Sequence, residues 1–214
     1  MRALPSLSIL LLLAPLLLGA AAPQSSATWP TARLDDIAVE ARSVTQLALV
    51  FPQDAEVTHF DDTWGHARSG GRRHKGADLM APKLTPIYAV ADGVVSIMRK
   101  SGLAGYWIGI EHAGGVESWY MHLNNDTPGT DNGRASLGQV YAPGIEVGSF
   151  VSAGQLIGYV GDSGNAERSG SHTHFELRVD GHAVDPYPLL VEAHERALEV
   201  ARLSRLAVLI DHVD

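Results

Sequence analysis

One segment near the C-terminal end of the chain has an alternating pattern: Ser171-His172-Thr173-His174-Phe175-Glu176-Leu177-Arg178-Val179, with His172, His174, Glu176 and Arg178 on one side and Thr173, Phe175, Leu177 and Val179 on the other. A period of two residues is typical of a β-strand with one buried face. His172 and His174 therefore point to the same side of this strand, roughly 6.5 to 7 Å apart along it. From the residues alone, this face fits a metal site and fits equally a solvated strand surface.

The sequence before this segment contains short β-branched and aromatic runs separated by turn residues. They lie at 87–90, 93–98, 106–112, 116–123, 147–151 and 155–160. Strands of this length, spaced about 8 to 12 residues apart, indicate an antiparallel β-sandwich or barrel. Apolar residues at helical spacing predict a short N-terminal helical segment at 34–50 and a C-terminal helix at 189–206. The predicted fold class is therefore mainly β, with helical segments only at the two ends.

The composition narrows the function and the chemistry of any site. A chain of 214 residues with 45% hydrophobic and 19% charged residues is typical of one globular domain. Its formal net charge of −8 argues against a nucleic-acid partner or an acidic membrane surface. The chain has no cysteine, so it has no disulfides, and a metal site has to be built from His, Asp and Glu.

The first 21 residues have the composition of an export signal. Arg2 is followed by an apolar run at 7–18 and by small residues at 19–22, which is the pattern of a secretory signal peptide. The apolar run is short for a membrane span, although an uncleaved anchor is the alternative. We therefore predict a signal peptide at 1–21, a leader with a short helix at 22–50, a β domain at 51–186 and a C-terminal helix at 187–214. The mature chain is expected in the periplasm or cell wall, without a membrane span.

Two further places in the sequence offer candidate site residues. His74 and Asp78 would lie roughly 13 Å apart in an extended chain, and either a bend at Gly76 or a helical turn would bring them together. His122 is polar within an otherwise apolar strand end, and strand alternation predicts that it shares a face with Tyr120. Taken singly, each is as easily a surface or core residue as a site residue.

Taken in order, three blocks of sequence resemble the lysostaphin/LytM-type zinc metalloendopeptidases, which cut peptide bonds of bacterial peptidoglycan. The blocks are Arg73-His74-x-x-x-Asp78, then Tyr120-x-His122-Leu123, then Gly161-Asp162-Ser163-Gly164 running to His172-Thr173-His174-Phe175-Glu176. The resemblance covers about residues 51–186. It implies an antiparallel β-sandwich of the duplicated-hybrid-motif type.

The resemblance also implies roles for individual residues. The zinc ligands would be His74, Asp78 and His174, and the catalytic histidines would be His122 and His172. The residues alone do not distinguish His172 from His174. Three protein ligands would leave one zinc position open, which is the arrangement of a catalytic site. Glu176 would either orient a ligand or form an ordinary salt bridge.

The loop before His74 departs from the family pattern because it contains no tyrosine. Its polar and aromatic residues are Trp64, His66, Arg68, Arg72 and Arg73, so the donor that assists the oxyanion is left open, and we interpret His66 as a loop residue. The long loop at 124–145 is expected to border the substrate groove. We interpret His59, His112 and His182 as structural residues, and His194 and His212 as solvated or capping residues.

The predicted function is that of an exported zinc (Zn²⁺) endopeptidase that hydrolyses cross-links or stem peptides of peptidoglycan. The alternative is a non-enzymatic regulator of the same fold that activates a partner hydrolase. The predicted partner is therefore a peptidoglycan peptide. A protein partner is compatible with the sequence and is not identified by it. The sequence does not specify which peptide bond is cut.

Overall fold

The computed structural model describes residues 48–211, all of which belong to one compact unit. The predicted signal peptide and most of the predicted helix at 34–50 lie outside the described residues. The last three residues of that range, at 48–50, are not helical. Within 48–211, no helix is both long enough and apolar enough to cross a membrane.

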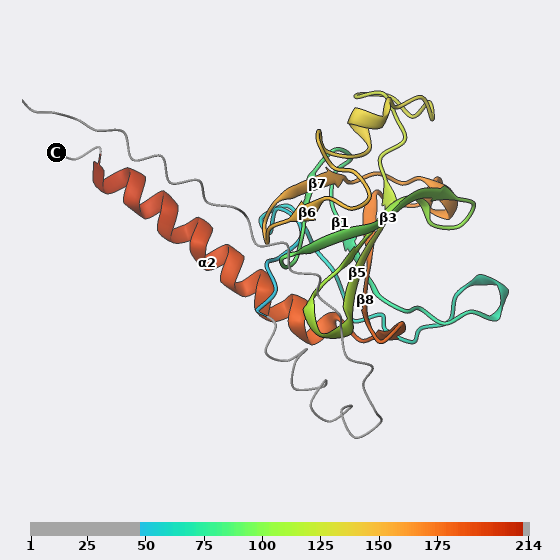
Figure 1. Ribbon diagram of the computed structural model, residues 1–214. Helices are drawn as coiled ribbons and strands as arrows, with labels where there is room; N and C mark the ends of the chain where they lie inside the picture. Colours follow the sequence, from blue (N-terminus) through green and yellow to red (C-terminus); the bar gives the residue numbers. More distant parts are fainter. Residues whose placement is uncertain (1–47, 212–214) are drawn as a thin grey trace, which may run out of the picture. The chain divides into compact units, whose positions relative to one another are not determined.

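The described chain is mainly antiparallel β (Figure 1). The larger sheet has the order β1-β8-β5-β4-β3-β6, with β9 paired to β8, while β2 and β7 form a second sheet. The strand bounds are β1 Ala77–Met80, β2 Pro86–Tyr88, β3 Gly93–Ser101, β4 Gly105–Glu111, β5 Val116–Leu123, β6 Phe150–Val151, β7 Leu156–Tyr159, β8 His172–Val179 and β9 His182–Val184.

Both sheets contribute to a single hydrophobic core. Ile87 of β2 and Ile157 of β7 are fully buried, as are Ile108 of β4 and Phe175 of β8. Burying an aliphatic or aromatic side chain of this size contributes about 1.5–3 kcal/mol. The apolar face of β8 therefore holds this strand against the core, and its other face carries His172 and His174.

The C-terminal helix α2 runs from Tyr187 to Asp211, which is longer than the predicted 189–206. Its first turns pack on the β domain, where Leu190 and Ala193 are buried. His194 bonds through Nε2 to the carbonyl oxygen of Ala55 at 2.9 Å, and its ring lies 4.8 Å from that of Phe51. The expected solvated or capping role of His194 is therefore wrong, because this histidine packs between the helix and the domain.

A chain of buried hydrogen bonds connects His112, which follows β4, through two side chains of β5 to the loop after β2. Its Nδ1 lies 2.8 Å from the carbonyl oxygen of Asp92, and this oxygen only accepts, so Nδ1 carries the proton. Its Nε2 then accepts from Ser118 Oγ at 2.7 Å. Ser118 Oγ also bonds Tyr120 Oη at 3.0 Å, and Tyr120 Oη accepts from the amide of Val90. This network fixes a neutral His112 inside the fold.

We expect the free energy of unfolding to decrease as the pH is lowered, and part of this decrease should come from His112. Burial lowers the pKa of His112, and the hydrogen bond with Asp92 only partly offsets this effect. Below about pH 6.5 the unfolded chain therefore binds a proton that the folded chain lacks, which destabilises the fold by at most about 1.4 kcal/mol per pH unit. Urea unfolding between about pH 7 and pH 5 should show a steeper loss for the wild type than for His112→Gln. Equal slopes would contradict the prediction.

Candidate metal centre

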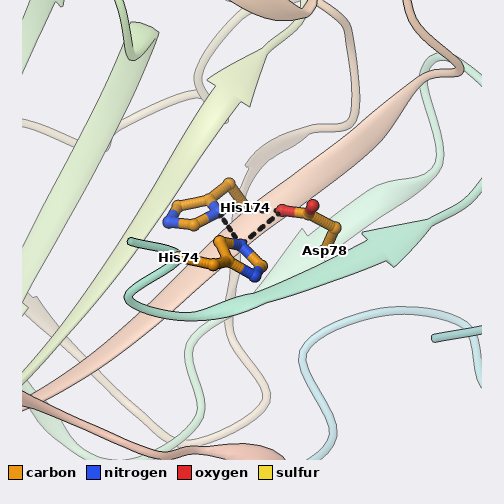
Figure 2. A group of neighbouring side chains, drawn as sticks. All are labelled: His74, Asp78 and His174. Atoms are coloured by element: carbon orange, nitrogen blue, oxygen red, sulfur yellow. Dashed lines mark hydrogen bonds and ion pairs between the residues drawn. The ribbon is translucent and has the colours of Figure 1, made fainter. Parts of the chain in front are cut away.

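The structure brings His74, Asp78 and His174 together at one point (Figure 2). His74 Nε2 lies 3.1 Å from Asp78 Oδ1 and 3.0 Å from His174 Nδ1. Asp78 Oδ1 and His174 Nδ1 are 2.8 Å apart. In the β1–β8 register Asp78 is directly opposite His174. A bend at Gly76, which sequence analysis gave as one of two possibilities, carries His74 to the same place.

Gly76 makes this approach possible because it has no side chain. A Cβ at this position would lie 2.3 Å from the carbonyl oxygen of Phe175 and 3.0 Å from Nε2 of His174. The backbone of Phe175 belongs to β8 and has no room to move away. The glycine therefore sets the distance between the two segments that carry the candidate ligands.

In both His74 and His174, the ring nitrogen that points away from Asp78 faces a hydrogen-bond acceptor. His74 Nδ1 lies 3.0 Å from the carbonyl oxygen of Thr63, and His174 Nε2 lies 3.4 Å from a carboxylate oxygen of Glu176. With the outer proton held in this way, each ring has a lone pair to turn toward a cation beside Asp78 Oδ1; without a cation, the inner nitrogens donate to Asp78 instead. Three acceptor atoms at this spacing repel one another unless a cation lies among them, and outer partners of this kind are the usual supports of metal-ligating histidines.

The charges of the cluster shift the pKa values of its members. Burial by itself would raise the pKa of Asp78, but the hydrogen bonds and charges of His174 and His74 hold it well below its usual range. Burial would lower the pKa of His174, but the hydrogen bonds and charges of Asp78 and Glu176 raise it. Asp78 is therefore an ionised acceptor, as a hard or borderline cation requires.

His122 and His172 face this cluster from the other side. Their rings are 5.0 Å apart, and the ring of His122 is 6.0 Å from that of His174. Both are buried. His122 Nδ1 lies 2.8 Å from the carbonyl oxygen of Ser163, and His172 Nδ1 lies 2.7 Å from that of Gly170. Each ring therefore uses Nδ1 to bond a backbone carbonyl and turns its Nε2 toward the centre of the site.

The local environment depresses the basicity of His122. Burial and the neighbouring His172 lower the pKa of His122 to about 4, although its hydrogen bond to Ser163 acts in the opposite direction. His122 is consequently a neutral imidazole at pH 7. A neutral imidazole has a free lone pair and accepts a proton readily when a more acidic group is brought to it.

His122 reaches the site because its backbone breaks the strand alternation. The register pairs Tyr120 with Phe175, on the core face, and Met121 with His174, on the site face. His122 would then face the core, as the predicted shared face with Tyr120 requires. Its φ of 61° instead lies in the left-handed region, which turns the ring to the site, so the predicted shared face is wrong. Such backbone outliers are concentrated at functional sites.

The four histidines lie in a cleft of about 830 Å³. Arg68 enters it from the loop before His74 and donates to Asp78 Oδ2 at 2.5 Å. Its other lining residues include Ala67, Ser69, Arg72, Arg73, Lys75, Leu103, Ala104, Asn165, Ala166 and Ser169. Among the described residues, none at 124–145 lines it, so the expectation that this loop borders the groove is wrong.

A family model described as Peptidase family M23 matches residues 72–186, which is more than half of the chain. The chain belongs to peptidase family M23. All five residues that the sequence pointed to lie within the matched range. The M23 domain therefore contains the three candidate metal ligands and both further histidines in one continuous segment.

Relatives and solved structures agree with M23 membership. The peptidoglycan DD-endopeptidase ShyA of Vibrio cholerae is 32% identical over 112 residues, covering 52% of this chain and 22% of ShyA. A putative glycyl-glycine endopeptidase LytM from Ruminococcus gnavus has a TM-score of 0.55 at 29% identity, covering 69% of this chain and 61% of that one. A zinc-containing peptidase from Vibrio cholerae has a TM-score of 0.50 at 27% identity, and the match covers 63% of this chain and 37% of that one.

The two structural matches confirm the predicted mainly β, antiparallel fold class. This chain spans between a fifth and two fifths of the length of the curated M23 relatives that it matches. Their names therefore describe larger proteins, of which this chain resembles one part.

Elsewhere in the M23 domain, a second group of carboxylates already surrounds a cation of the protein itself. Asp126, Asp131 and Asp162 have oxygen atoms close enough to hold a cation. The ammonium group of Lys83 lies among them, at 2.6 Å from Asp126, 2.8 Å from Asp131 and 2.8 Å from Asp162. Lys83 thus takes the place of a metal, and the group joins the 124–145 loop to the end of β7. His66 is exposed and outside both groups.

Proposed function

We propose that this chain is an exported zinc endopeptidase that hydrolyses peptide bonds of bacterial peptidoglycan. One observation carries the proposal: two imidazole lone pairs and an ionised carboxylate converge at the bottom of a cleft, with two more imidazoles facing them. Membership of M23, and relatives named as peptidoglycan endopeptidases, support the reaction and the substrate. The signal-like sequence at 1–21 supports export to the periplasm or cell wall.

His74 Nε2, Asp78 Oδ1 and His174 Nδ1 would hold the zinc ion. The donor set fits, because two neutral imidazoles and one carboxylate are ligands that zinc accepts, and their spacing of 2.8–3.1 Å approaches that of tetrahedral ligands, roughly 3.3 Å. A zinc ion supplies Lewis acidity, which makes a water molecule more acidic and polarises a carbonyl group. A zinc-containing relative of the same fold supports the choice of metal.

His122 and His172 would move the protons of the reaction. Each donates its Nδ1 proton to a backbone carbonyl, which fixes the ring and leaves Nε2 pointing into the cleft. One of them would take a proton from the attacking water, and the other, carrying a proton on Nε2, would donate it to the oxyanion or to the leaving amine. The peptide chain would lie in the cleft between them and Asp78.

No observation favours the non-enzymatic alternative. A regulator that only binds a partner hydrolase has no need for three converging metal-ligand atoms or for two further oriented histidines. In this chain all five residues are present, and the described structure places them around one cleft.

Metal removal tests the proposal directly. The purified mature chain is expected to contain about one zinc per molecule and to release new amino groups from purified cell walls. A chelator should abolish this release, and a stoichiometric amount of zinc should restore it. Mass spectrometry of the products from defined muropeptides would identify the bond. A protein that hydrolyses walls equally well after complete metal removal would contradict the proposal.

A further inference from the structure

The segment that leads to His74 folds back on itself as a β-hairpin. The amide of Arg68 donates to the carbonyl of Arg72 at 3.0 Å, and the amide of His74 donates to that of His66 at 2.9 Å. Positive φ values of 71° and 74° at Gly70 and Gly71 close the turn. We call residues 65–74 the arginine hairpin; it is the teal hairpin at the right of Figure 1. Its side chains form one wall of the cleft.

The arginine hairpin and Lys75 place more positive charge in the cleft than the protein neutralises. Of the four cations that line it, only Arg68 pairs with a carboxylate. Arg72 donates to the backbone and hydroxyl oxygens of Ser69, and Arg73 donates to a backbone carbonyl. Lys75 is exposed and has no hydrogen-bond or ion-pair partner among residues 48–211.

The carboxylates of the cleft do not offset these cations. Asp78 and Glu176 are the only acidic residues among those that line it. Asp78 is taken up by the metal cluster and Arg68, and Glu176 bonds Arg178 at 2.7 Å and His174 at 3.4 Å. Three cations therefore remain without a carboxylate partner in a chain whose formal net charge is −8. This local excess of positive charge is opposite in sign to the net charge of the whole chain, so it is a property of the cleft.

We propose that Arg72, Arg73 and Lys75 bind free carboxylates of the peptide substrate, so that the enzyme prefers an anionic peptide to a neutral one such as oligoglycine. This inference rests on the proposed function and specifies its substrate class. Guanidinium groups bind carboxylates through paired, charge-assisted hydrogen bonds. A cleft of one charge sign also raises the local concentration of substrates of the opposite sign.

The test uses the full mature chain with zinc and two cross-linked muropeptides that differ only in their carboxylates, which are free in one and amidated in the other. The wild type is expected to show a kcat/KM roughly tenfold or more higher for the free-acid peptide. This ratio should decrease as salt is added. In the triple variant R72Q/R73Q/K75Q the ratio should fall toward one, mainly through a higher KM for the free-acid peptide.

A matched control separates this effect from a general loss of charge. Arg134→Gln removes one positive charge from an exposed position outside the cleft, and the ratio should not change. If the triple variant does not fold, Lys75→Gln removes a cation without a partner and should lower the ratio by a smaller factor. Equal kcat/KM values for both peptides in the wild type would overturn the inference and keep the proposed function. Hydrolysis of neither peptide would overturn the proposed function itself.

Discussion

Replacement of His122 by asparagine is expected to leave the metal in place and to lower kcat by about 10²–10⁴-fold. His122 supplies none of the three atoms that converge on the metal site, and its Nε2 points into the cleft. Asparagine is the appropriate substitution because it tolerates the left-handed backbone that this position requires. Zinc content and wall hydrolysis, measured on the same preparation, separate a proton-transfer role from metal binding.

Two companion variants define the outcome. His174→Gln removes a candidate ligand and should lose both zinc and activity. His66→Asn removes an exposed histidine outside the cluster and should keep both. If His122→Asn lost its zinc together with its activity, His122 would support the cluster rather than take part in proton transfer.

Replacement of Lys83 by methionine is expected to lower the free energy of unfolding by about 3–5 kcal/mol. The side chains of Asp126 and Asp162 are only 2% and 6% exposed, and both lie within 2.8 Å of the Lys83 ammonium. Without that charge, two nearly buried carboxylates would face each other unpaired. Each kcal/mol lowers Tm by about 2–4 °C in a chain of this size, so calorimetry should detect a large shift.

The exposed partner of Lys83 gives the control. Asp131 is also 2.8 Å from Lys83, but its side chain is 68% exposed, so Asp131→Asn should cost less than about 1 kcal/mol. The triple variant K83M/D126N/D162N should recover part of the stability that Lys83→Met loses, because it leaves no buried charge. If Lys83→Met and Asp131→Asn had equal effects, the buried ion cluster would contribute little to stability.

The strands that sequence analysis located best are those with the strictest patterns. β5 begins and ends where the β-branched and aromatic run predicts, at 116–123, and β8 occupies 172–179, where the polar and apolar residues alternate. β1 and β9 were not predicted, because four and three residues are too few for a periodic signal. β1 contains an aspartate, which is uncommon in strands, and it forms only because β8 provides a partner across the register.

The five candidate site residues were found from the sequence, and the structure brings them to one place. Two expectations about their surroundings failed for physical reasons. The side to which His122 turns depends on a positive φ that no alternation pattern reveals. The 124–145 loop is tied down by Lys83 through Asp126 and Asp131, and it therefore lies outside the cleft that its length suggested it would border.

Of the groups that orient the histidines, only Glu176 was considered from the sequence, and the others were not predicted. Thr63, Ser163 and Gly170 act through backbone carbonyl oxygens, and every residue type has such an oxygen. Among these positions, only Ser163 belongs to a block that the family resemblance marked, Gly161-Asp162-Ser163-Gly164. The structure explains why this block contains a glycine after Ser163. A Cβ at Gly164 would meet the backbone of Gly105 at 2.3 Å, so the glycine lets this segment lie against the start of β4, where the Ser163 carbonyl accepts from His122.

The contacts of the metal cluster join parts of the chain that are far apart in sequence. His74 and His174 are separated by 100 residues, and His122 and Ser163 by 41. Contacts of such long range form late, because the loop between them has to close first. A newly made or refolding chain therefore has no competent ligand set until β1 and β8 have paired. During refolding, zinc should therefore bind after most of the backbone has folded. The rate of zinc binding should then measure the last step of folding.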